Sequence, residues 1–101
     1  IAEYEKVIAK DPDDIPARFR LAELCHQNKD FQKTVEVYEA LITLKEKIDT
    51  NQRCSALMRL SEIHAHDLAD IEAARAYLDT IIKEYAGSKY AGYAMTRLDS
   101  L

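Results

Sequence analysis

Apolar residues recur along this chain at the spacing of an α-helix, in two alternating patterns. In the first pattern they fall at i, i+4, i+7 and i+8, which is one stripe of a helix with about 3.6 residues per turn. This first pattern is carried by Ala17, Leu21, Leu24 and Cys25, by Ala56, Leu60, Ile63 and His64, and by Ala94, Leu98 and Leu101. The second pattern is carried by Phe31, Thr34, Tyr38, Leu41 and Ile42, and by Ile71, Ala74, Leu78, Ile81 and Ile82. The chain therefore alternates two kinds of amphipathic helix, here called A and B.

Short sequence motifs repeat in step with these helices. The A motif occurs as "RLAEL" at 20–24, "RLSEI" at 59–63 and "RLDSL" at 97–101, and the B motif as "YEKVI" at 4–8, "YEALI" at 38–42 and "LDTII" at 78–82. The two series interleave, so one A helix and one B helix form a repeating unit. Tyr4, Val7 and Ile8 then belong to a B helix whose A partner is missing. Because the chain opens within a helix and without Met, we expect it to be a piece of a longer protein.

Helix-breaking and helix-capping residues mark the ends of these helices. A proline or glycine ends one helix, and a short polar side chain caps the next. The residues interpreted in this way are Pro12, Asp13 or Asp14, Asp30, Asp70, Gly87 and Ser88. No Gly or Pro interrupts residues 43–53, so the second B helix is expected to continue by about one turn. The sequence predicts six helices, at 1–10, 14–28, 30–48, 51–67, 70–85 and 89–101.

The composition agrees with a helical domain and argues against several other classes. Two Gly and two Pro in 101 residues favour long helices and short connections. With 48% hydrophobic and 32% charged residues the chain is too apolar for disorder, and no run reaches the about 20 apolar residues that span a bilayer. A net charge of −4 with mixed signs leaves no basic stripe for nucleic acid. Cys25 and Cys54 form no disulfide framework, which favours the cytoplasm and leaves the bacterial periplasm open.

The repeated motifs resemble the tetratricopeptide repeat family across essentially the whole chain. The family's unit is a helix–turn–helix of about 34 residues, with a small residue in each helix where the two backbones approach. The matching positions are Leu21, Ala22, Cys25, Thr34 and Tyr38 in one unit, and Leu60, Ser61, His64, Ala74 and Leu78 in the next. The stretch "EYAGSKYAGYAMTRLDSL" is also similar to a phrasing common in bacterial members. We therefore expect a single repeat domain over 1–101, divided into 1–13, 14–50, 51–87 and 88–101.

Several positions depart from the family pattern. Arg18 and Leu57 stand where the family prefers Trp, and Cys25 and His64 stand where it prefers Tyr. Asp99 replaces the small residue in the last unit, so the final helix is expected to lack a B partner or to act as a cap. The repeat spacings of 38 to 40 exceed the family's, partly because the turn "HDLAD" has one extra residue.

The resemblance implies a right-handed superhelical solenoid of antiparallel helix pairs that acts as a non-enzymatic protein-interaction scaffold, with A helices lining a concave groove. A peptide or helix segment of another protein would bind there, with Phe19, Met58 and Tyr93 as apolar anchors and Glu23 and Glu62 as acidic guides. These two carboxylates argue against the subclass that grips acidic chaperone tails. The full predicted contact set is Phe19, Glu23, His26, Gln27, Met58, Glu62, His66 and Tyr93.

Two other functions stay open. The chain could self-associate by stacking its repeat ends, or it could be an accessory domain of a larger enzyme or membrane-associated protein. Within this stretch we predict no catalytic, cofactor or metal site, because there is no Gly-rich phosphate loop and no activated nucleophile.

The histidines and acids of the A helices are the strongest candidates for a metal site. His64 and His66 point about 200° apart on a helix and cannot share a ligand. Glu62 with His66, and Glu23 with His26, are better interpreted as helical pairs than as metal ligands. Among the thiols, Cys54 is expected to be the more exposed.

Overall fold

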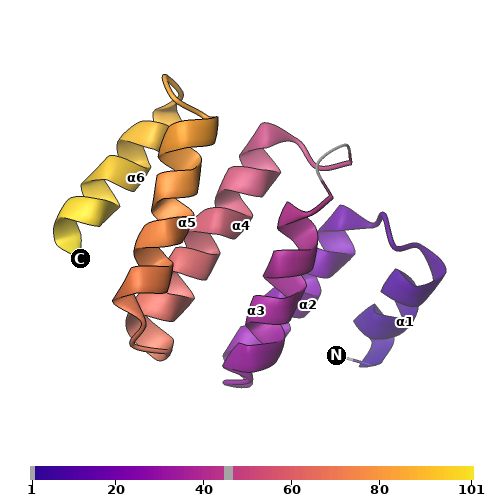
Figure 1. The fold of residues 1–101 in the computed structure, drawn as a ribbon. Coiled ribbons are helices and arrows are strands. Elements are labelled where there is room, and N and C mark those ends of the chain that lie inside the picture. The colour runs from indigo at the N-terminus through magenta and orange to yellow at the C-terminus, as the bar shows by residue number, and fades with distance from the viewer. Residues whose placement is uncertain (1, 45–46) are drawn as a thin grey trace. The chain divides into compact units, whose positions relative to one another are not determined.

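The computed structural model describes residues 2–44 and 47–101, and every element in these ranges is helical. The α-helices are α1 (Ala2–Lys10), α2 (Ile15–Gln27), α3 (Phe31–Ile42), α4 (Thr50–Glu62), α5 (Ile71–Glu84) and α6 (Lys89–Ser100) (Figure 1). A π-helical segment, η1 (Ile63–Asp67), continues α4. The chain divides into two compact units, Ile1–Asp49 and Thr50–Leu101. The predicted all-α class and the succession of helix pairs are confirmed.

In the first unit, α2 and α3 pack against each other as an A–B hairpin, and α1 packs on α2. The apolar stripes predicted from the sequence form this contact, since most of their side chains are buried. The buried members are Ala17, Leu21 and Cys25 on α2, and Thr34, Tyr38 and Leu41 on α3. Burial of this stripe is what gives an amphipathic helix most of its stability in water.

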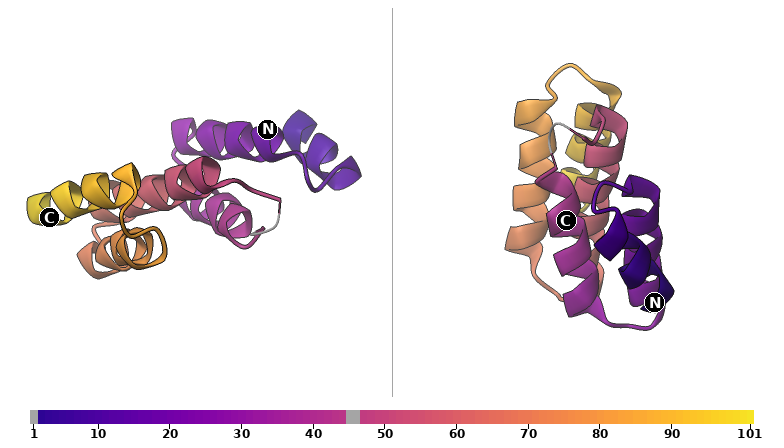
Figure 2. Two further views of the ribbon diagram at one scale, coloured as in Figure 1. Left: turned by 90° about the horizontal axis from the view of Figure 1, so that it is seen from above. Right: turned by 90° about the vertical axis from the view of Figure 1, so that its right-hand side faces the viewer.

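In the second unit, α5 packs against both α4 and α6. Seen from above, α4 and α6 lie side by side in one layer and α5 lies in the other (Figure 2). The buried core includes Cys54, Ala56, Leu57, Leu60, Ile63, Ala74, Leu78, Ile81, Ala91 and Ala94. The small residues predicted to let helices A and B approach, Ala22 with Thr34 and Ser61 with Ala74, are all buried.

The predicted N-caps are observed for four helices. The side chains of Asp14, Asp30, Asp70 and Ser88 each accept a hydrogen bond from a backbone N–H three residues later. Each bond satisfies one of the amides that the first turn of a helix leaves without a partner. Gly87, with φ of 84°, ends the turn after α5 in the left-handed region that favours glycine.

The predicted extension of the second B helix to residue 48 is wrong. Helix α3 ends at Ile42, and Thr43 caps it with its hydroxyl bonded to the Ala40 carbonyl. Ile48 is buried and its N–H bonds to the Leu44 carbonyl. The chain therefore leaves α3 at Thr43 although no helix breaker stands there. Residues 45 and 46 of the predicted extension lie outside the described residues.

The connection after α2 is a Schellman turn without glycine. The Lys29 N–H donates to the His26 carbonyl at 3.0 Å, and the Asp30 N–H donates to the Cys25 carbonyl at 2.9 Å. Lys29 adopts a φ of 61°, in the left-handed region. These bonds satisfy carbonyls at the end of α2 and place Asp30 as the N-cap of α3.

The corresponding connection after α4 contains the extra residue, and η1 accommodates it. Here the Leu68 N–H donates to the carbonyl of Ile63, five residues earlier, at 3.0 Å. The equivalent N–H in the first repeat, that of Asn28, donates to the carbonyl of Leu24, four residues earlier. The Asp70 N–H donates to the His64 carbonyl, and Ala69 adopts a φ of 52°. The predicted α-helix over 51–67 therefore ends at Glu62, and the last turn is widened into a π-helix. In both repeats a residue with positive φ precedes an aspartate N-cap.

Candidate protein-binding surface

Two rows of side chains in the second unit share a face where α4 and α6 lie side by side. On α4 the row is spaced by three or four residues, so it forms one stripe of the helix, and the same holds on α6. We call this surface the α4–α6 face, and its members are Asn51, Ser55, Met58 and Glu62 on α4, with Tyr90, Tyr93 and Arg97 on α6.

Two polar bridges join the rows near their ends. The Tyr90 hydroxyl donates to Oδ1 of Asn51 at 2.5 Å, and Nη2 of Arg97 donates to Oε1 of Glu62 at 3.0 Å. The first bridge joins the N-terminal turns of α4 and α6, and the second joins positions near their C-terminal turns. The helices therefore run parallel, and the residues between the bridges are held on a common surface.

Three of the predicted contact residues lie on this face. Met58 is half-buried, and Tyr93 is 56% exposed with its ring edge-to-face on Tyr90 at 6.2 Å between centroids. Glu62 is half-buried and bound to Arg97. His66 is exposed in η1. Among the described residues Glu62 binds Arg97, and the helical pair with His66 suggested by the spacing is not observed.

The other predicted contact residues belong to α2 in the first unit. Phe19 is half-buried, with its ring edge-to-face on Tyr38 at 6.0 Å, so it contributes to packing within the unit. The His26 ring is tilted against Phe31 at 5.6 Å. Glu23 is half-buried and Gln27 is exposed.

Each predicted acidic guide forms an ion pair with an arginine of its own unit. Glu62 pairs with Arg97, and Glu23 pairs with Arg20 at 3.0 Å. The pKa of Arg20 is raised by hydrogen bonds with Tyr4 and with Glu23. Because these pairs are substantially exposed, water screens them and they contribute little to stability. They do neutralise the carboxylates locally, so neither Glu23 nor Glu62 is an isolated negative charge.

Arg53 is a buried polar residue that the sequence analysis did not single out. Its Nη1 donates to Oε1 of Glu84 and to the Tyr85 hydroxyl, both at 2.9 Å, and its guanidinium lies over the Tyr85 ring at 5.8 Å. Burial alone would lower the pKa of Arg53, but the bonds to Tyr85 and Glu84 outweigh it and raise the pKa. Arg53 thus links the start of α4 to the end of α5. Its burial could have been predicted from the sequence, because it lies three residues before Ala56 on the same side of the helix.

The expectation that Cys54 is the more exposed cysteine is wrong. Its exposed fraction is 0%, and Cys25 is buried as predicted. Burial raises the pKa of both thiols, which disfavours the reactive thiolate. Both cysteines are therefore small apolar core residues.

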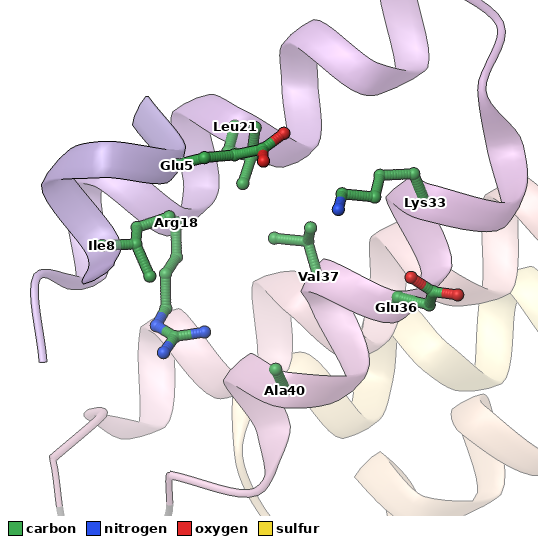
Figure 3. Close-up of a pocket in the computed structure, with 8 residues that line it drawn as sticks. All are labelled: Glu5, Ile8, Arg18, Leu21, Lys33, Glu36, Val37 and Ala40. Carbon is green, nitrogen blue, oxygen red and sulfur yellow. The ribbon is translucent and has the colours of Figure 1, made fainter. Parts of the chain in front are cut away.

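A cavity of about 240 Å³ lies in the first unit among α1, α2 and α3 (Figure 3). Its apolar lining is Ile8, Leu21, Val37 and Ala40, and its charged lining is Glu5, Arg18, Lys33 and Glu36. Glu5 and Lys33 extend toward it from opposite sides (Figure 3). Such a lining can accept an apolar side chain, and it includes no Ser, Thr, Cys or His side chain. Sequence periodicity could not find this cavity, because its walls come from three helices.

Over 2–44 and 47–101, no group of three or more His, Cys, Asp or Glu side chains is placed to hold a metal ion. In the same ranges no helix is both long enough and apolar enough to cross a membrane.

Comparison with known proteins identifies the class of the second unit's helix pair. Residues 55–88 match the family model of the tetratricopeptide repeat. This match covers most of α4 together with η1 and α5, and it confirms the predicted resemblance for these residues. No curated protein and no solved structure matches the chain. Residues 55–88 thus form a tetratricopeptide repeat, a unit that typically serves as a non-catalytic scaffold for protein–protein interaction.

Proposed function

We propose that the chain binds a peptide or helical segment of a partner protein on the α4–α6 face, with Met58 and Tyr93 as the apolar contacts. The observation that carries the proposal is the pair of bridges, Asn51 with Tyr90 and Glu62 with Arg97. They hold two helices in register while Tyr93, a large aromatic side chain, stays more than half exposed. A surface ordered before binding loses less entropy on association.

The chemistry of the face favours an apolar segment with hydrogen-bonding capacity. Tyrosine is enriched among residues that dominate binding energy, because it offers large area at small entropic cost. Arg97 occupies one oxygen of Glu62, and the carboxylate can accept a further hydrogen bond from a partner N–H. Because Glu23 and Glu62 are paired with arginines, they attract a basic partner less strongly than the sequence suggested. The proposed binding therefore depends mainly on the apolar contacts of Met58 and Tyr93.

The same binding mode extends by repeat register to the first unit. Phe19 and Glu23 lie 39 positions before Met58 and Glu62, on the corresponding face of α2. His26 and Gln27 are exposed toward the end of that helix. We assign these four residues a secondary role, since the Phe19 ring already packs on Tyr38.

The proposal is tested with peptides selected from a displayed library of random sequences. Selected peptides are titrated against the wild-type chain, Tyr93→Ala, Met58→Ala and a matched control, Met95→Ala. Met95 is 52% exposed on the same helix but points about 200° from Tyr93, so it lies off the face. We expect Tyr93→Ala to weaken binding about tenfold, which corresponds to about 1.4 kcal/mol, and Met95→Ala to change it less than about twofold.

The control distinguishes specific binding on this face from non-specific hydrophobic binding elsewhere on α6. Tyr93 and Met95 are both exposed, so neither substitution should unfold the chain, and circular dichroism checks this. If peptides bind equally well to Tyr93→Ala and to wild type, or if Met95→Ala is the damaging change, the α4–α6 face is not the binding surface.

A further inference from the structure

The polar groups that remain free on the α4–α6 face are mostly hydrogen-bond donors. Asn51 accepts from the Tyr90 hydroxyl through its Oδ1, and Arg97 donates to Glu62 through its Nη2. Among the described residues, the Nδ2 amide of Asn51, the other N–H groups of Arg97 and the Tyr93 hydroxyl have no partner. The second carboxylate oxygen of Glu62 is the matching free acceptor. The face therefore suits a ligand that presents carbonyl groups in need of donors.

The apolar part of the same face is a corner between two aromatic rings. The rings of Tyr90 and Tyr93 lie edge-to-face, at 82° to each other, with centroids 6.2 Å apart. Two ring planes at nearly a right angle present two apolar walls to a compact side chain. Met58, which is half-buried on α4, lies between the same two bridges and extends this surface. The corner therefore fits a small apolar ring.

The opening of this corner does not depend on the helix that follows α6. Ser55 lies 38 positions before Tyr93, at the same place in the repeat. Ser55 is exposed even though α6 is the A helix that follows α4 and is bonded to it at both ends of the face. An A helix that followed α6 in the same way would leave Tyr93 open as well.

We propose that the occupant of the α4–α6 face is a proline-rich segment in the polyproline II conformation, an inference that rests on the proposed function of this face. A polyproline II backbone has no internal hydrogen bonds, so its carbonyl groups are free to accept from Asn51 and Arg97. Proline has no backbone N–H, which matches a face with few free acceptors. Its ring packs in the corner of Tyr90 and Tyr93, since such segments dock in aromatic-lined grooves.

A helical segment is a poorer match for the same groups. Its backbone carbonyls bond within the helix, so they cannot accept from Asn51 or Arg97. A polyproline II segment is also stiff before it binds, and the two bridges hold the face in register. Association of two ordered partners loses little conformational entropy, which favours binding on a shallow surface.

The experiment titrates the chain with an end-capped decamer of L-proline and, as the matched control, with the same decamer of D-proline. The two probes have equal composition and equal numbers of carbonyl groups, but their helices have opposite hands. Chemical shifts of the isotope-labelled chain follow binding up to millimolar peptide. We expect the L-proline decamer to shift the amide signals of α4 and α6, and the D-proline decamer to bind about tenfold more weakly.

Asn51→Asp tests the donors without removing the bridge. The aspartate keeps an oxygen for the Tyr90 hydroxyl and lacks the Nδ2 amide, and a carboxylate in the first turn of α4 favours the helix. We expect this variant to bind the L-proline decamer about threefold to tenfold more weakly, which is the effect of losing one hydrogen bond. Tyr93→Ala should weaken binding about tenfold and Met95→Ala less than about twofold, with circular dichroism confirming that each variant is folded.

Three results would overturn the inference. They are the absence of shifts with millimolar L-proline decamer, equal binding of the two decamers, and unweakened binding by Asn51→Asp. The library-selected peptides distinguish this failure from failure of the proposed function. If those peptides bind and lose affinity with Tyr93→Ala while the L-proline decamer does not bind, only the proline-rich occupant is wrong. If neither kind of peptide binds this face, both proposals are wrong.

Discussion

Lys29 and Ala69 hold equivalent backbone conformations just before the N-caps of α3 and α5. Their φ values of 61° and 52° lie in the left-handed region, where a Cβ atom crowds the following carbonyl. Turns of this type usually have glycine at the position of positive φ. Among the described residues, glycine occupies such a position only at Gly87, after α5. Both connections therefore store a small amount of backbone strain.

This strain predicts that Lys29→Gly and Ala69→Gly each stabilise the chain, by up to about 1 kcal/mol, because glycine adopts positive φ without steric cost. The matched reverse change is Gly87→Ala, which should destabilise by about 1 kcal/mol. No atom lies within 4 Å of a Cβ built at Gly87, so its cost is backbone conformation alone. Urea unfolding measures all three. Loss of stability in both glycine variants would contradict the assigned turn geometry.

His64 occupies a position where the family prefers tyrosine, and its imidazole ring packs there in place of a phenol ring. The imidazole stacks on Tyr77 with centroids 5.3 Å apart and an interplanar angle of 27°. Both of its ring nitrogens are buried and without a hydrogen-bond partner among the described residues. The ring fills space at the position where the family prefers tyrosine, and the unsatisfied nitrogens lower the stability gained from that packing.

At the scale of elements, η1 explains how the two repeats differ in length without differing in architecture. A single extra residue in an α-helix would rotate everything after it by about 100°. Widening the last turn of α4 absorbs the residue before Ala69 and Asp70, so a residue with positive φ followed by an aspartate N-cap precedes α5 just as it precedes α3. The longer repeat spacing is therefore a local feature.

Deletion of His66 tests this account. We expect the loss of stability to stay within about 1 kcal/mol, because the Ile63–Leu68 bond then has the α-helical spacing and Asp70 remains the N-cap. The control is deletion of Ala76, an exposed residue in α5, which turns Leu78 and Ile81 off the buried face and should cost more than about 3 kcal/mol. Urea unfolding compares the two deletions, and equal losses would refute the absorbing role of η1.

At the scale of the whole molecule, the chain comprises two compact units, each with its own buried core. Leu41 belongs to the first and Leu78 to the second, and both side chains are almost fully buried. In repeat proteins stability is approximately a sum of unit and nearest-neighbour terms, so a core change acts mainly where it is made.

Leu41→Ala should therefore cost about 2–5 kcal/mol and raise amide hydrogen exchange mainly in residues 2–44. Leu78→Ala is the matched variant and should act mainly on residues 50–101. Hydrogen exchange read by mass spectrometry resolves the two segments. Equal loss of protection in both segments from either variant would show that the units unfold as one.

The sequence by itself determined the number of helices, their A and B alternation, the caps at Asp30, Asp70 and Ser88, and the small residues between paired helices. It left the cap of α2 open between Asp13 and Asp14. These features depend on periodicity and on contacts within about four residues, which repeat in this chain and can be compared with one another. Helical spacing also placed Met58 and Glu62 on one side of α4, and their role in binding, with that of Tyr93, stays a prediction.

Only the tertiary structure decided which of these residues are paired, buried or free. The bonds of Arg53 to Glu84 and of Glu62 to Arg97 join residues 31 and 35 positions apart, and no local pattern specifies them. Helix α3 ended at Ile42 where the sequence contained no helix breaker, and packing buried Cys54. The physical reason is that helical periodicity is a property of neighbours along the chain, whereas charge pairing and burial depend on what other helices bring close.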